Sequence, residues 1–473
     1  MNSALRRILM LVMLLSTGCA KLLGDNQPRE VQRDVPASYG IDPGPSATSV
    51  AQAHWDELFT DADLSALLEA ALENNQELNI QLQEIIIAKS EVGARRGEYL
   101  PRLGAGVGVG VEKVGADTSQ GVSDAAHNVP ENLLDLRFGL SASWEVDVWG
   151  KLRNAAKAAN SRYLATIEAK NFLTTQVIAE IARSYYELIA IDQSIAVVDR
   201  YVSLTEGALE TVRFKKAAAR ATELAVQRFE AEVSRSKARR YTLVQRRVQA
   251  ENRINFLVGR FPQHVARSSE LLDEQALARV TNTGLPTQLL DNRADVRRAE
   301  LQLEAAKLNV KSAKAQFYPS LTLDAGVGYE TFNAAHLLTT PQSLAYNVAG
   351  GLVAPLLNRK AIKAQYQTAN AMQIQAVFAF EKTLLLAYTE VVNELARIEN
   401  LADRYTQLTA QVETLEHAVE VSGLLYRSAH ADYMEVLLTR RDALEAEQEL
   451  IEAKLQRMLA MVALYRALGG GWR

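Results

Sequence analysis

The residue types that most often carry enzymatic chemistry lack the spacing that such chemistry needs. The glycines of 104–110 read GxGxG, lack the third glycine of a dinucleotide-binding loop, and are not expected to open a helix. Gly150 and Lys151 are not a phosphate-binding loop, because Glu145 and Leu152 replace its first glycine and its hydroxyl residue. The histidines form no HExxH motif and no close pair: His54, His127, His264, His336, His417 and His430. We therefore expect no enzyme, no metal site and no cofactor.

The only cysteine suggests chemistry of another kind. Arg6 and Arg7 precede an apolar run at 8–15, and small residues at 16–18 lead to Cys19, as in a secretory signal peptide. The pattern resembles a bacterial lipoprotein signal. That resemblance implies a signal peptide over 1–18 and a covalent lipid on Cys19 as the first mature residue. The alternative is a buried free thiol.

The composition of the chain limits which kinds of molecule it is expected to bind. The 473 residues are 48% hydrophobic and 23% charged, with a net charge of −4, which argues against non-specific nucleic-acid binding. No later stretch has 18 consecutive apolar residues, so we expect no transmembrane helix. If the mature chain crosses a membrane, it must do so as a closed β-barrel.

Two proline-free stretches predict long helices. Proline is absent from 131–261 and 356–473, and one proline inside a helix costs about 3 kcal/mol. Apolar residues recur every seven positions in both stretches: Ile181, Leu188, Ile195, Val202 and Leu209, and then Val391, Ile398, Tyr405, Val412, Val419 and Tyr426. Sustained heptads predict coiled-coil hairpins, here the wall of a rod or tube.

Short stretches alternate apolar residues with small or polar ones. In the first, Leu103, Ala105, Val107, Val109 and Val111 alternate with glycines. About ten residues with one apolar face and one small or polar face are typical of a membrane β-barrel strand. An ordinary half-buried sheet is the other interpretation.

The chain repeats itself. Pro101 aligns with Pro319, and Phe256-Leu257-Val258-Gly259 aligns with Arg466-Ala467-Leu468-Gly469. After an extended segment at 19–60, each repeat is expected to hold a helix (61–99, 287–317), two strands and a helical hairpin. The first repeat, 61–265, has strands near 102–114 and 134–147 and its hairpin at 150–258. An equatorial segment, 266–286, precedes the second repeat, 287–473, with strands near 320–331 and 343–355 and its hairpin at 358–468.

The strand count predicts an assembly. Four strands cannot close a membrane barrel, since known barrels begin at about eight. Three copies would supply about twelve. The fold class is therefore mainly α with a small β part, built as a duplicated helix, β-hairpin and long coiled-coil hairpin.

Four segments resemble the TolC-like outer-membrane efflux channels, in their lipoprotein branch. They are Ser143-Trp-Glu-Val-Asp-Val-Trp-Gly-Lys-Leu-Arg153, Asn292-Arg-Ala-Asp-Val-Arg-Arg-Ala-Glu300, Phe317-Tyr-Pro-Ser-Leu321 and Tyr465-Arg-Ala-Leu-Gly-Gly-Gly-Trp472. The resemblance implies a homotrimer in the outer membrane and its lipid, with a 12-stranded barrel on a periplasmic α-helical barrel. It implies a periplasmic adaptor protein, an inner-membrane pump of the RND type, and export of drugs or other toxic compounds.

The resemblance also places a periplasmic gate at the helical tips. Tyr426 and Glu435 match the family's tyrosine and acidic residue nine positions later, and Met434 matches a narrowing apolar position. Phe214 and Glu223 show the same spacing in the first hairpin. Leu438 replaces a second acidic residue, so an acidic ring would be single. The alternative is a solvated coiled-coil face.

Charge differs between the two hairpins. Residues 213–247 hold eleven Lys/Arg against three acids, and residues 387–435 hold nine acids against three Arg. We hypothesise that a basic first tip, with Lys215, Lys216 and Arg220, and an acidic second tip, with Asp432, pair between neighbouring limbs as a latch. The alternative is scattered surface charge, and exposed pairs contribute only about 0–1 kcal/mol each.

Two other classes of protein fit the sequence less well than an export duct. A periplasmic coiled-coil scaffold or adaptor would explain the heptads but leaves the amphipathic strands without purpose. An enzyme has no supporting constellation of residues.

Overall fold

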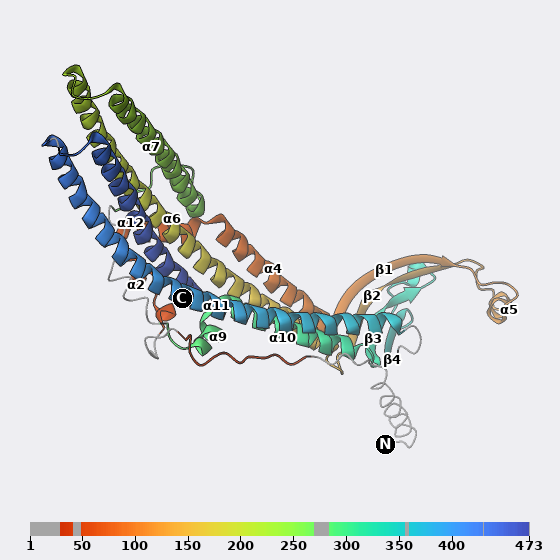
Figure 1. Ribbon diagram of the computed structural model, residues 1–473. Coiled ribbons are helices and arrows are strands. Elements are labelled where there is room, and N and C mark those ends of the chain that lie inside the picture. Colours follow the sequence, from red (N-terminus) through yellow and green to blue (C-terminus); the bar gives the residue numbers. More distant parts are fainter. Residues whose placement is uncertain (1–28, 41–48, 269–282, 355–358, 429, 473) are drawn as a thin grey trace. The chain divides into compact units, whose positions relative to one another are not determined.

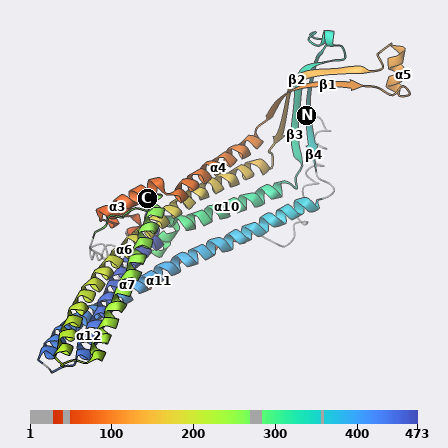
Figure 2. The ribbon, with the colours of Figure 1, turned by 90° about the horizontal axis from the view of Figure 1, so that it is seen from above.

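The computed structural model describes residues 29–40, 49–268, 283–354, 359–428 and 430–472. Cys19 and most of the equatorial segment at 266–286 lie outside these ranges. The helices and strands follow in order (Figures 1 and 2): η2 Val50–Gln52, α2 Trp55–Leu58, α3 Ala62–Asn74, α4 Gln76–Tyr99, β1 Arg102–Glu112, α5 Ser119–Ala126, β2 Leu133–Val146, α6 Lys151–Ala217, α7 Glu223–Val258, η3 Pro286–Gln288, α9 Leu289–Asn292, α10 Ala294–Ala315, β3 Ser320–Thr331, η4 Ala334–His336, β4 Leu344–Val353, α11 Lys360–Arg427 and α12 Tyr433–Leu468.

The chain divides into two compact units, and each takes parts of both sequence repeats. The strand unit comprises Met1–Val31, Ile85–Ala165 and Glu300–Ala379. The helical unit comprises Gln32–Glu84, Thr166–Ala299 and Phe380–Arg473. None of the helices in the described ranges combines the length and the apolar character that a membrane span requires.

The strand unit holds one four-stranded antiparallel sheet in the order β1-β2-β3-β4. Its register places apolar residues opposite apolar ones, and the rings of Phe138 and Tyr329 stack with their centroids 5.3 Å apart. This apolar face is open, since Leu103, Val107 and Val348 are 83%, 84% and 83% exposed. The four strands therefore occur where the alternation predicts them.

The helical unit is built on two antiparallel hairpins, α6–α7 and α11–α12, whose ends lie together in both views (Figures 1 and 2). Most heptad positions are buried; Ile181 and Leu188 of α6 and Val391 of α11 are fully so. One apolar cluster joins the hairpins and consists of Ile195, Val198, Tyr201, Leu243 and Leu444. The heptads thus form the packed seam of the hairpins.

The two expected leading helices are each broken, which corrects the prediction of single helices at 61–99 and 287–317. Asn75 is extended between α3 and α4, and Arg293 is extended between α9 and α10. Each break packs against a glycine that ends a hairpin, Gly259 with φ 81° and Gly469 with φ 91°. The breaks let the returning helix of each repeat seat against its first helix.

The N-terminal segment is only partly extended, because η2 and α2 interrupt the range 19–60. Its described start, at 29–40, lies along α11. The Gln373 side chain donates to the Arg29 carbonyl oxygen at 3.0 Å, and the Tyr388 hydroxyl donates to the Ser38 carbonyl oxygen at 3.0 Å. Tyr39 stacks on Tyr388 with ring centroids 5.6 Å apart. This segment is therefore held by specific contacts to the second hairpin.

Candidate functional site

The candidate site lies at the tips of the two hairpins, and both turns are built alike. The Arg220 amide donates to the Lys215 carbonyl oxygen at 2.8 Å, and the His430 amide donates to the Leu425 carbonyl oxygen at 2.9 Å. Ala219 takes the left-handed conformation, with φ 56°. These contacts recur at the spacing of the sequence repeat and give both tips the same tight turn.

Side chains at the turns start the returning helices. The Thr222 hydroxyl accepts the Ala225 amide at 3.3 Å and caps α7. The Asp432 carboxylate accepts the Tyr433 amide at 2.7 Å and caps α12. Asp432, a latch candidate, thus has a structural role in its own helix.

An apolar cluster supports the tips from below. It consists of Leu209, Val212, Ala225, Val226, Phe229, Val233 and Leu437, with Ala208, Ala221 and Tyr433 packed against it. Leu437 and Tyr433 belong to α12, and the other residues belong to the first hairpin. The tips therefore share one packed core.

Three gate candidates make contacts at the tips: Tyr426 and Met434 contact the first hairpin, and Glu223 contacts its own hairpin. The Lys215 ammonium lies 3.6 Å from the centroid of the Tyr426 ring, across the two hairpins. The Arg228 Nη1 donates to the Met434 Sδ at 3.2 Å, again across the hairpins. Glu223, by contrast, pairs with Lys216 of its own hairpin. That hydrogen bond holds the pKa of Glu223 below its ordinary value.

Two gate candidates point into solvent. The Phe214 side chain is 76% exposed, and Glu435 is exposed on the first turn of α12. Among the described residues, no ion pair or aromatic ring contact joins either side chain to Tyr426 or Met434. Whether they meet their counterparts in neighbouring copies stays a prediction.

Several basic side chains of the first hairpin pair with acids on that same hairpin. Arg213 pairs with Glu230 at 2.6 Å, Lys237 with Glu206 at 2.7 Å and Arg240 with Asp199 at 2.6 Å. Arg220 is exposed at the turn. Of the four latch candidates, Lys216 pairs with Glu223 and Lys215 lies over the Tyr426 ring. A latch between copies through Arg220 and Asp432 stays a prediction.

Three further contacts join the two hairpins, and no pattern in the sequence predicts them. Arg200 pairs with Glu447, and Arg239 donates to Gln448. Arg440 donates from Nη1 to the Leu204 carbonyl oxygen at 3.1 Å. These partners are more than 200 residues apart, and no spacing in the sequence joins them.

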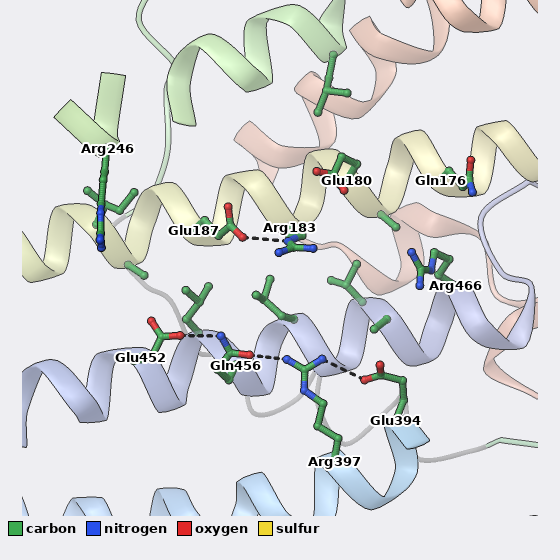
Figure 3. Close-up of a pocket in the computed structure, with 18 of the residues that line it drawn as sticks. Gln176, Glu180, Arg183, Glu187, Arg246, Glu394, Arg397, Glu452, Gln456 and Arg466 are labelled. Carbon is green, nitrogen blue, oxygen red and sulfur yellow. Dashed lines mark hydrogen bonds and ion pairs between the residues drawn. The ribbon is translucent and has the colours of Figure 1, made fainter. Parts of the chain in front are cut away.

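A groove of about 740 Å³ runs between α6 and α12 (Figure 3). Charged side chains from both helices and from α11 line it and bind one another. Arg183 pairs with Glu187 at 3.0 Å, and this contact raises the pKa of Arg183 despite partial burial. On the other wall Arg397 pairs with Glu394 at 3.3 Å and binds Gln456. Apolar and charged side chains line the groove together, and some of the charges pair within it. In the described part of the chain, no group of three or more residues could hold a metal ion.

Comparison with known proteins agrees with this architecture. The family model for the outer membrane efflux protein matches residues 67–260 and 285–470. The pyoverdine export outer membrane protein OpmQ of Pseudomonas aeruginosa is 27% identical over 89% of this chain and 87% of its own. The solvent efflux pump outer membrane protein SrpC of Pseudomonas putida is 27% identical over 98% of this chain and 97% of its own.

Solved structures share the fold. The outer-membrane channel OprN superimposes with a TM-score of 0.84 at 21% identity, over 94% of this chain and 99% of its own. The open state of the Neisseria gonorrhoeae MtrE outer membrane channel does so with a TM-score of 0.81 at 25% identity, over 94% of this chain and 98% of its own. The fold, the seam of heptads and the family match agree, and this chain belongs to the outer membrane efflux protein family.

Proposed function

We propose that three copies of this chain form the exit duct of a tripartite efflux pump. The four strands of each copy join those of its neighbours into a twelve-stranded barrel in the outer membrane. The helical hairpins form the periplasmic tunnel below it. Solutes pass through passively, and the chain supplies the passage and the gate.

The observation that carries this proposal is the sheet itself. β1 and β4 are the two edge strands of the sheet, and the outer edge of each pairs with no other strand among the described residues. The two strands are antiparallel to each other. Long exposed edges pair with other chains unless they are covered. In a membrane every backbone group needs a partner, so closure by neighbouring copies satisfies both edges at once.

The gate is proposed at the hairpin tips, with Tyr426 and Met434 held to the first hairpin and Glu435 facing solvent. Glu435→Ala and Arg220→Ala should raise the conductance of the channel in planar bilayers. Arg220→Ala removes a charge from the basic tip of the proposed latch, and Glu435→Ala removes one from the acidic tip that it would pair with. Unchanged conductance in both variants would refute the latch while leaving the duct intact.

We propose two protein partners, a periplasmic adaptor and an inner-membrane pump of the RND type. Relatives of similar identity are described as exporting pyoverdine, solvents and cations. Because relatives of one family export such different compounds, we propose that the inner-membrane pump selects the drugs or other toxic compounds and that this chain only conducts them.

A lipid on Cys19 is proposed to anchor the segment that continues at Arg29 along α11. Radioactive palmitate should label the parent chain, and Cys19→Ser should abolish the label. Label that persists in this variant would exclude lipidation at Cys19.

One experiment tests the duct as a whole. The chain is extracted from purified outer membranes in mild detergent, and its mass is measured without heating and after heating. The proposal predicts a particle of three chains that dissociates on heating and that conducts ions in planar bilayers. A monomer in the periplasmic fraction would overturn it.

A further inference from the structure

The polar face of the sheet carries a gradation of side-chain size. Two rows across the strands hold only small or short side chains: Gly106, Gly139, Gly328 and Ala345, and then Gly104, Ser141, Gly326 and Asn347. At nearly constant backbone radius, the space inside a barrel depends on the inward side chains. If this face lines the duct, as the proposed function requires, these rows form its wide section.

The next row toward the β1–β2 loop is filled by charge. Gly108 lies opposite Arg137, which lies opposite Glu330 on β3. The Arg137 side chain covers Gly108 so closely that a Cβ there would lie 2.9 Å from its Cγ. Arg137 Nη2 lies 3.3 Å from Asp135 Oδ2, so the cation is held in place above the sheet.

Charge is unbalanced at this end of the strands. This end of the polar face carries three carboxylates, Glu112, Asp135 and Glu330, and one cation, Arg137. Nearby, Lys113 pairs separately with Glu131 at 2.5 Å. At the opposite end of the same face Arg102 and Asp324 flank Ser143, and Glu145 pairs with Lys151 at 2.5 Å. The excess of carboxylates is therefore confined to the loop end.

We infer that Asp135, Arg137 and Glu330 form a charge filter at the outer end of the duct, which favours cationic over anionic solutes. Threefold repetition would multiply the carboxylate excess around one ring. Rings of charged side chains are a general means by which pores select by charge. The filter rests on the proposed function, because it needs this face to line an aqueous passage.

Cysteine reactivity on intact cells tests the filter locally, independent of the gate at the tips. Ala345→Cys lies on the polar face, roughly 8 Å from Glu330 by strand geometry. Its reaction rates with a trimethylammonium and a sulfonate methanethiosulfonate reagent report the local potential. Gly106→Cys, which lies in the same row and has open space for a Cβ, serves if Ala345→Cys does not assemble. The parent chain, with Cys19 alone, gives the background.

The filter predicts faster reaction with the cationic reagent. Glu330→Gln should lower the ratio of the two rates by about threefold, and Arg137→Gln should raise it by a similar factor. Asp324→Asn makes the same charge change more than a Debye length away, at about 13 Å, and should leave the ratio unchanged.

Two outcomes overturn the inference in distinguishable ways. Val348→Cys lies on the apolar face and should be unreactive in the membrane. If Val348→Cys reacts as fast as Ala345→Cys, the strands do not line a membrane duct, and the proposed function fails with the filter. If Ala345→Cys reacts and Val348→Cys does not, but Glu330→Gln and Arg137→Gln leave the ratio of the two reaction rates unchanged, the filter alone is wrong.

Discussion

Asn75 donates its side-chain amide to the carbonyl oxygen of Leu257 at 2.7 Å, and so joins the break between α3 and α4 to the end of α7. The second repeat does the same with a different residue, since Arg293 donates to the Ala467 carbonyl oxygen at 2.9 Å. The duplicated chain thus preserves a contact between a helix break and a helix end, and this contact fixes the root of each hairpin.

The glycines at the hairpin roots should not tolerate a side chain. A Cβ at Gly469 would lie 2.6 Å from the Asn292 carbonyl oxygen, and a Cβ at Gly259 would lie 2.4 Å from that of Asn74. Gly469→Ala and Gly259→Ala should each lower the free energy of unfolding by about 2 kcal/mol or more, measured by urea denaturation in detergent. Gly207→Ala, in α6 with open space around it, should gain up to about 1 kcal/mol. Equal effects at all three positions would contradict this account of the roots.

Arg293 should be the most sensitive cation of the helical unit. It is 5% exposed and binds Asp295 and Glu390, each at 2.7 Å. Burial opposes its charge, but these two partners outweigh burial and raise its pKa. Arg293→Met should cost about 3 kcal/mol or more in the free energy of unfolding, because two carboxylates lose their partner.

The control for Arg293 is Arg298, which is exposed on α10, the helix that begins directly after Arg293. Arg298→Met should shift the urea midpoint little. A loss as large as that of Arg293→Met would mean that the helix, rather than the buried ion pair, was responsible.

The ring of Tyr426 should hold the tips together. Its removal frees the Lys215 ammonium, which lies over the ring face. In a trimer three such contacts are lost, so Tyr426→Ala should raise the open fraction in single-channel recordings about tenfold or more. Tyr426→Phe keeps the ring and should behave as the parent. If Tyr426→Ala and Tyr426→Phe change the open fraction by the same amount, the ring contact is not the cause.

Glu447 should make stability depend on pH. Burial raises the pKa of Glu447 above its ordinary value of 4.5, against the attraction of Arg200, and Glu416 raises it further. A carboxyl whose pKa is higher in the folded state stabilises fully below its unfolded pKa and loses that contribution as pH rises through the folded pKa. The parent should therefore lose stability relative to Glu447→Gln as pH rises above 4.5.

The measurement for Glu447 is the urea midpoint of both chains across this pH range. Glu449→Gln, at an exposed position on the same helix, should follow the parent in parallel. A constant difference between the parent and Glu447→Gln would refute the raised pKa.

Some features were open to prediction because they rest on local periodicity. The alternation from Leu103 to Val111 predicts β1, and the heptads of Ile181 and Leu188 predict the buried seam of α6. The helix break at Asn75 was missed, although a signal exists. Its Oδ1 accepts the Leu78 amide at 3.0 Å, and asparagine is a favoured residue at a helix start.

The tip contacts could not be read from the sequence. Lys215 meets Tyr426, and Arg228 meets Met434, only because the two hairpins pack with one particular register. Heptads predict that hairpins pack but not which residues face across them. The same limit holds for the row that joins Arg137 to Glu330, which depends on the pairing of β2 with β3.

Closure of the sheet between copies is the central claim, and cysteine cross-linking across its free edges tests it most directly. Val107→Cys on β1 is combined with either Tyr346→Cys or Val348→Cys on β4, and the chains are oxidised in the outer membrane. Val107→Cys with Phe138→Cys, which face each other inside one sheet, is the intramolecular control. The account predicts covalent trimers on denaturing gels for at least one edge pair and monomers for the control. Monomers alone for both edge pairs would contradict it.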